Sequence, residues 1–312
     1  MKSSNITLSK SMIRTLIEVV RGNNSMALLE KKLNSSKSWT TRVINKLQEF
    51  GFIKKNKNGI SLRLELADSS HAIAFKDMFV EQPNKNYEDI LSGRNLDVLL
   101  AIVTGEKNTK IIGKMLSVQP RVVRLRINFL AGSGLINKSM HKYSISNTQE
   151  YLIKFLKEIR NYSKYNGRLI WKFGIECLIK VLSESDMEGE TTGMNRYKDF
   201  EIPVNTVYYM CYKGHDKISV SLAFIHSLFE INDARTTAIA ITYFAKNKLF
   251  LKENFNKMHD TSEKYDKSSI VDEIMLIYNS VKKWQKIKSS LLPFADYKEI
   301  EKQFELYGVK NV

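Results

Sequence analysis

Hydrophobic and polar residues follow a pattern that occurs twice in the first half of the chain. A shift of 83 residues lays residues 19–62 over residues 102–145 without a gap. Glycines and large aliphatic residues match at spacings that place the aliphatic ones on one face of a helix. The matched pairs are Gly22 and Gly105, Leu33 and Leu116, Ile44 and Ile127, Leu47 and Leu130, and Gly51 and Gly134. The sequence therefore predicts two copies of one module.

Each copy predicts three helices and a two-stranded hairpin. The first two helices are expected over 9–21 and 25–33 in one copy, and over 95–103 and 109–116 in the other. A polar turn and a longer third helix follow. The residues expected to start these third helices are Ser35 and Ser36 as caps in the first copy, Ser117 as a cap in the second, and Pro120 in a first helical turn.

Glycines mark the ends of the two third helices. Gly51 and Gly134 are suited to the position after a helix, and short apolar stretches then start the hairpins. The stretches that carry this pattern read LQEFGFIKK and FLAGSGLINK. They resemble the end of the recognition helix and the start of the wing in prokaryotic winged-helix regulators of the MarR-like kind. The resemblance implies two DNA-binding modules and does not indicate which DNA sequence they bind.

The third helix of such a module would present its outward face to the major groove. In the first copy the expected inward residues are Trp39, Val43, Ile44 and Leu47, and the expected outward residues are Lys37, Ser38, Thr40, Thr41, Arg42 and Lys46. In the second copy they are Val122, Val123, Ile127 and Leu130 inward, and Arg121 and Arg124 outward, with Arg126 able to reach either side. Because arginine suits bidentate contacts with guanine, the second helix is the stronger candidate for base readout.

Lysines in the hairpins complete the predicted DNA-binding set. They are Lys54, Lys55 and Lys57 in the first copy, and Lys138 and Lys142 in the second. Contacts from these lysines to phosphates would supply affinity and register more than sequence choice. Winged helices also serve as protein-binding modules, and a lysine-rich hairpin is often only a solvated turn. One copy could therefore bind DNA while the other packs against a neighbour.

The charge of the chain favours a polyanionic partner. The formal net charge is +16 and the sequence pI is about 9.6. Residues 1–150 carry 24 Lys and Arg against 12 Asp and Glu, whereas the remaining residues carry 25 against 21. We expect a cytoplasmic protein with no membrane partner. The sequence has only two cysteines, no signal-peptide pattern and no long apolar run.

The pattern changes in the second half, where we expect an α+β domain. Three strand-like runs read GRLIWKFG, IECLIKVL and VNTVYYMCYK, and a short helix capped by threonine is expected within residues 190–204. Helical patterns dominate from Ser219 onward. The fold class expected for the whole chain is α+β and helix-rich. The expected domains are a winged helix over 1–66, a structured linker over 67–92, a winged helix over 93–147 and an α+β domain over 148–312.

This second half resembles, more weakly, the C-terminal domain of abortive-infection (AbiEi-type) antitoxins and related archaeal regulators. The residues that carry the resemblance are GRLIWKFG, the TTG of 191–193 and ISVSLAFIHSLF. Those antitoxins usually carry one winged helix. The resemblance implies a role in dimerisation, sensing or binding of a protein partner.

The sequence contains no motif of a known catalytic or metal site. GxSxG, GxxxxGK[ST], GxGxxG and HExxH are all missing. Cys211 and His215 are only two potential ligands, so a core cysteine and a loop histidine are expected rather than a metal site. The acidic run 183–190 is expected to be a solvated loop and His226 a satisfied, partly buried residue. We therefore expect no cofactor, no metal and no enzymatic activity.

The leading hypothesis is a sequence-specific regulator that binds double-stranded DNA through both modules. The alternative is an antitoxin-like protein that neutralises a partner through its second half and autoregulates its operon. A nucleic-acid enzyme would need acidic or metal-binding residues that converge on one cleft.

Overall fold

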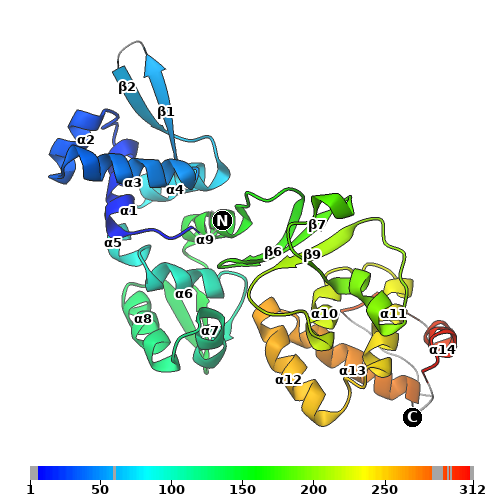
Figure 1. Ribbon diagram of the computed structural model, residues 1–312. Helices are drawn as coiled ribbons and strands as arrows, with labels where there is room; N and C mark the ends of the chain where they lie inside the picture. The colour runs from blue at the N-terminus through cyan, green and yellow to red at the C-terminus, as the bar shows by residue number, and fades with distance from the viewer. Residues whose placement is uncertain (1–5, 59–60, 283–290, 294, 296, 310–312) are drawn as a thin grey trace. The chain divides into compact units, whose positions relative to one another are not determined.

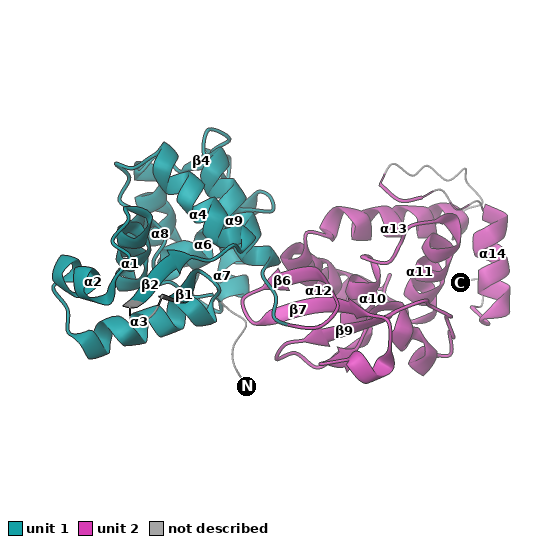
Figure 2. Ribbon diagram, turned by 90° about the horizontal axis from the view of Figure 1, so that it is seen from above, with its two compact units in different colours: residues 1–164 teal, residues 165–312 magenta. Residues whose placement is uncertain are grey.

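The protein is α+β and helix-rich, as expected, and its sheets are small (Figure 1). The structure is a computed structural model that describes residues 6–309 apart from 59–60, 283–290, 294 and 296. The chain divides into two compact units, Met1–Lys164 and Tyr165–Val312 (Figure 2). Unit 1 contains both copies of the repeat, and unit 2 contains the rest.

The first module, residues 10–66, has three helices and a hairpin. Its elements are α1 (Lys10–Val20), α2 (Met26–Leu33), α3 (Lys37–Glu49), β1 (Ile53–Asn58) and β2 (Ser61–Leu66). Hydroxyls of Ser9, Ser25 and Ser36 each accept a hydrogen bond from a backbone N–H in the first turn of the helix that follows. The cap expected at Ser36 is thereby confirmed. An isolated antiparallel bridge joins Ser25 to Arg63 of β2.

The second module, residues 94–145, repeats this order with one more short strand. Its elements are α6 (Arg94–Ile102), β3 (Lys107–Asn108), α7 (Thr109–Leu116), α8 (Pro120–Gly132), β4 (Ile136–Ser139) and β5 (Lys142–Ile145). The sheet has the order β3-β5-β4, with β3 antiparallel to β5. The hydrophobic pattern does not predict β3, because a two-residue strand is defined by its pairing.

The turn before α8 differs from the expectation. Ser117 does not cap α8; it ends α7 with a left-handed φ of 52°, as Asn34 ends α2 with a φ of 48°. The cap of α8 is Gln119, which makes no side-chain cap bond, and Pro120 occupies the first turn as expected. Gly51 and Gly134 follow the two long helices with φ of 76° and 70°, the left-handed conformation that glycine adopts without strain.

The helix before unit 2 belongs to unit 1. Helix α9 (Glu150–Asn161) packs on α4 (Ser70–Glu81), and α5 (Tyr87–Ile90) leads into α6. The rings of Phe75 and Phe155 lie 5.6 Å apart, and Phe155 is fully buried. The division of the chain therefore lies after Lys164 and not after residue 147, because the apolar stripe of α9 is covered by the linker helix α4.

Unit 2 consists of one antiparallel sheet and a set of helices. The strands are β6 (Arg168–Phe173), β7 (Glu176–Val181), β8 (Glu190–Thr191) and β9 (Tyr209–Lys213), in the order β6-β7-β9-β8. The α-helices are α10 (Val220–Ser227), α11 (Ala234–Lys246), α12 (Lys252–Ser262), α13 (Ser268–Lys282) and α14 (Tyr297–Leu306). The expected threonine-capped helix is the 3-10 helix η2 (Gly193–Phe200), but its cap residue Thr192 makes no side-chain cap bond.

Candidate nucleic-acid interface

The outward face of α3 is polar. Lys37, Ser38 and Arg42 are exposed, and Thr41 is half-buried. Asn45 and Gln48 are also exposed on this helix, although sequence analysis did not include them. Their hydroxyl, amide and guanidinium groups can donate and accept hydrogen bonds, which is the chemistry that base edges in the major groove require.

Thr40 was wrongly expected on this face. Its side chain is 0% exposed, because it lies three and four residues before Val43 and Ile44 on the buried side of α3. The hydroxyl lies 3.1 Å from the Ser36 carbonyl and 2.8 Å from the Ser35 hydroxyl. Thr40 therefore stabilises the start of α3. Trp39, which was expected inward, is half-buried.

Two cations of the first module are held by neighbouring carboxylates. The Lys46 ammonium lies 3.0 Å from Glu49 and 4.7 Å from the centre of the Phe50 ring. The Lys54 ammonium lies 2.9 Å from Asp68. The hydrogen bond with Asp68 raises the pKa of Lys54. Both side chains are thus directed to acceptors in the module or directly after it.

The hairpin and α3 share one side of the first module. The Lys55 ammonium, on β1, donates a hydrogen bond to the side-chain oxygen of Asn45 on α3. Adjacent residues of a strand point to opposite faces, so Lys54 is turned away from this side. Lys57 lies in β1, but its side chain is outside the residues that the structure describes. Lys55 is consequently the hairpin lysine that accompanies the outward face of α3.

The second module carries cations that have no partner. Arg121, Arg124 and Arg126 on α8 are exposed, as are Lys138 on β4 and Lys142 on β5. No ion pair or hydrogen bond to these five side chains is found among the described residues. Lys138 occupies the position that matches Lys55 in the repeat. Its charge, unlike that of Lys55, has no acceptor in the described part of the chain.

A long stretch of the second module contains no acidic residue. Residues 107–149 carry eight Lys and Arg and no Asp or Glu. The charge of the two halves of the chain does not reveal this run, whereas the charge of shorter segments does. A surface without carboxylates keeps its positive potential and attracts polyanions.

Two apolar side chains lie exposed on α8 among its arginines. Leu125 is 62% exposed and Phe129 is 43% exposed. Their spacing of four residues places them on the same side of the helix. The matched positions in α3 are Arg42 and Lys46, so the two modules present different chemistry at the same place. The sequence pattern does not predict a role for Leu125 or Phe129.

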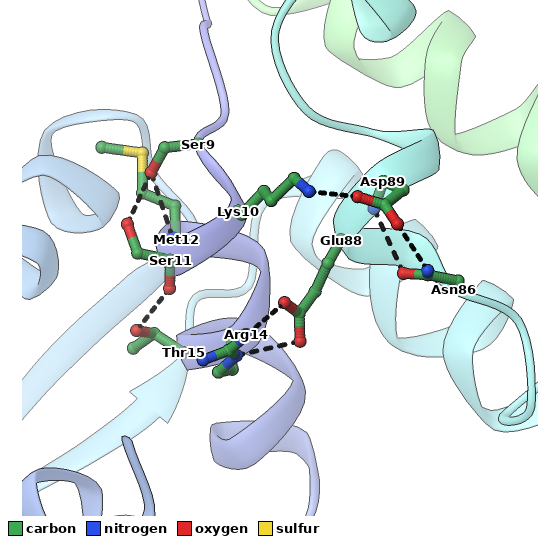
Figure 3. A network of polar contacts seen from close by, with 9 residues as sticks. All are labelled: Ser9, Lys10, Ser11, Met12, Arg14, Thr15, Asn86, Glu88 and Asp89. Carbon is green, nitrogen blue, oxygen red and sulfur yellow. Dashed lines mark hydrogen bonds and ion pairs between the residues drawn. The ribbon is translucent and has the colours of Figure 1, made fainter. Parts of the chain in front are cut away.

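The cations of α1 bind the linker. The Arg14 guanidinium donates two hydrogen bonds to Glu88, at 3.0 and 2.7 Å, and Lys10 pairs with Asp89 (Figure 3). The hydrogen bond from Lys10 lowers the pKa of Asp89. Asn86 also donates to Asp89, at 2.6 Å (Figure 3). These contacts join α1 to α5, so they belong to the packing of unit 1.

Unit 2 contains a buried polar cluster. His226 is fully buried, and its Nδ1 lies 2.7 Å from the Thr192 hydroxyl. Its Nε2 has no hydrogen-bond partner among the described atoms, so the expectation of a fully satisfied histidine is only half met. Burial lowers the pKa of His226 to about 3 and raises that of Glu230 to about 7. Both groups are therefore biased toward their neutral forms.

The potential metal ligands and thiols of unit 2 do not form a site in the described part of the chain. No three His, Cys, Asp or Glu side chains come together there as a metal site. Cys177 and Cys211 are both buried, and burial raises the pKa of both thiols, to about 11 for Cys177. His215 is exposed. A protonated, buried thiol is a poor nucleophile and a poor metal ligand.

Comparisons with protein-family models, curated proteins and solved structures give no match. Within the described ranges, no helix combines the length and the hydrophobicity that crossing a membrane would need. The function is therefore argued from the residues of the site alone.

Proposed function

We propose that this protein is a regulator that binds double-stranded DNA sequence-specifically through two winged helix-turn-helix modules. The observation that carries the proposal is the run of residues 107–149, which contains no Asp or Glu and places on α8 and the following hairpin five exposed cations without a partner among the described residues. A duplex offers closely spaced phosphates to such a surface, and release of its counterions favours binding.

The order of elements supports the same function. In each module two helices precede the long helix and a hairpin follows it, and in the second module the strand between the first two helices pairs with the last strand. In a winged helix-turn-helix protein the long helix enters the major groove and the hairpin contacts the flanking backbone. The bond between Lys55 and Asn45 supports a shared DNA-facing side for helix and hairpin.

Selection from a random duplex library by the full chain would test the proposal. Fluorescence anisotropy would then measure binding to the selected duplex and to a scrambled duplex at several salt concentrations. We expect at least a hundredfold preference for the selected duplex at physiological salt, within the range of specific DNA-binding proteins. Equal, strongly salt-dependent binding to both duplexes would mean that the surface is only basic. No binding to either would refute DNA binding.

The exposed Leu125 and Phe129 support a second candidate, in which the second module docks a protein. This would agree with an antitoxin-like role. In that role the first module binds the operator, and the second half of the chain neutralises a partner. Variants of the arginines on α8 separate the two functions, because a protein-docking module would leave DNA affinity unchanged when Arg121 and Arg124 are removed.

A further inference from the structure

Unit 2 has a pocket of about 470 Å³ beside the hairpin β6–β7. The lining residues include Asn166, Arg168, Lys180, Val181, Asp186 and Tyr208. The volume lies in the range of small-molecule sites. The wall combines two cations, an amide, an aromatic ring and the buried aliphatic side chain of Val181.

The two cations lie directly opposite each other on neighbouring strands. Arg168 of β6 is the register partner of Lys180 of β7. Like charges at opposed positions destabilise a sheet. Within the described residues neither side chain forms an ion pair with a carboxylate, and Asp186, although it lines the same pocket, stays beyond ion-pair distance. Lys180 interacts electrostatically with the buried Glu230, whereas no carboxylate among the described residues pairs with Arg168, so an anion between the two strands would relieve the remaining repulsion.

The backbone at this end of the hairpin also departs from a regular strand. Gly167 has a φ of 97°, and a Cβ there would lie 2.5 Å from the Lys180 carbonyl oxygen. A register irregularity follows between Leu169 and Trp171. Bulges of this kind redirect side chains and are frequent beside binding sites. The close approach of Gly167 to β7 requires glycine, because any side chain would collide with the strand.

The backbone that carries the aromatic wall is held by hydrogen bonds. The Tyr208 carbonyl accepts from the Thr206 hydroxyl at 2.8 Å and from the Asn195 amide at 3.2 Å. The Lys180 ammonium lies 3.8 Å from the centre of the Tyr208 ring. Ring and ammonium are thus held together at the pocket before any ligand enters, which lowers the entropic cost of binding.

We infer that this pocket binds a small organic dianion with a flat ring, such as a nucleoside monophosphate. The phosphate would lie between Arg168, whose fork geometry suits phosphate oxygens, and the ammonium of Lys180. The ring would lie against Tyr208. This inference does not depend on DNA binding, because it rests on unit 2 alone.

Isothermal titration calorimetry on the full-length protein would test the site, with adenosine 5′-monophosphate, adenosine and inorganic phosphate as separate probes. We expect one saturable site for the monophosphate, with at least tenfold weaker binding of each of the other two. Arg168→Gln and Lys180→Gln should each weaken binding at least tenfold. Lys217→Gln, which removes an exposed cation of unit 2 outside the pocket lining, should leave binding unchanged.

Thermal unfolding of the variants separates ligand binding from folding. Without ligand, Arg168→Gln should melt at the wild-type temperature or higher, because one of two opposed charges is removed. It should also lose the upward shift that the monophosphate causes in the wild type. The inference is overturned if the monophosphate does not bind, if it binds no better than inorganic phosphate, if both glutamine variants bind it normally, or if the unliganded variant melts lower.

Discussion

The two modules of unit 1 share an order of elements and differ in how they use charge. In the first, Lys46 pairs with Glu49, Lys54 pairs with Asp68 directly after the module, and Lys55 binds Asn45. In the second, the cations of α8 and its hairpin are exposed and have no partner among the described residues. Part of the positive charge of the first module is thus paired within unit 1, whereas the cations of the second module are available to an external partner.

The repeat preserves the core and varies the surface. Ile44 and Leu47 match Ile127 and Leu130, and all four are essentially inaccessible to solvent. At outward positions of the same helices, Arg42 matches Leu125. A buried aliphatic residue is constrained by packing on several sides, while an outward one is constrained only by what it binds. Under the proposed function, the two modules would therefore read different half-sites, and the DNA site would be asymmetric.

The largest predicted effect concerns base readout by the second module. Arg124→Ala should lose about 1–3 kcal/mol on the selected duplex and blur its sequence preference, because a bidentate contact with guanine would be lost. Thr41→Ala, at the matched position of α3, should lose only about 0.5–1.5 kcal/mol, the net value of one ordinary hydrogen bond. Anisotropy with both variants on the same duplex measures the difference.

Two outcomes would contradict this comparison. Equal losses for Arg124→Ala on selected and scrambled duplexes would make Arg124 a phosphate contact. A larger loss for Thr41→Ala than for Arg124→Ala would make α3 the principal reader, and the unpaired arginines would then need another partner.

The sequence predicted the parts of the fold that depend on local pattern. The apolar stripe of α3, the glycines after the long helices and the strand-like runs on either side of Gly174 follow from periodicity and backbone preference, and the structure has them. Thr40 was misplaced because its polarity was given more weight than its spacing from Val43 and Ile44. A small hydroxyl can be buried when it bonds to the preceding turn of its own helix.

Other features depend on contacts between distant residues and could not be predicted. The pairing of Lys54 with Asp68 and the bond from Lys55 to Asn45 require the hairpin to fold back on the helix. The opposition of Arg168 and Lys180 requires the register of β6 and β7. A list of lysines and arginines from the sequence therefore does not distinguish cations with an internal partner from cations available to a ligand.

The hairpins offer a sharper comparison at matched positions. Lys55→Ala and Lys138→Ala should each weaken binding to all duplexes and flatten the logarithmic salt dependence by about one unit, the share of one phosphate contact. Lys55→Ala should in addition alter sequence preference, since Asn45 loses its hydrogen-bond donor. Titrations at several salt concentrations give the slopes. An unchanged slope for either variant would mean that its hairpin faces solvent in the complex.

The smallest predicted effect concerns the two exposed apolar residues of α8. If Leu125 and Phe129 face the major groove, they suit the methyl group of thymine, which is an apolar feature of that groove. Replacing thymine by deoxyuridine in the half-site of the second module should then cost about 0.8 kcal/mol per methyl, or about fourfold in affinity.

The first module supplies the control for this last test, because Arg42 and Lys46 occupy the matched positions there. The same replacement in its half-site should leave affinity unchanged. In Leu125→Ala the penalty for deoxyuridine should shrink, since the side chain that meets the methyl is gone. A full penalty in that variant would exclude Leu125 from thymine contact. If Leu125→Ala and Phe129→Ala both bind every duplex like the wild type, the apolar pair does not face DNA, and the protein-docking alternative gains its support.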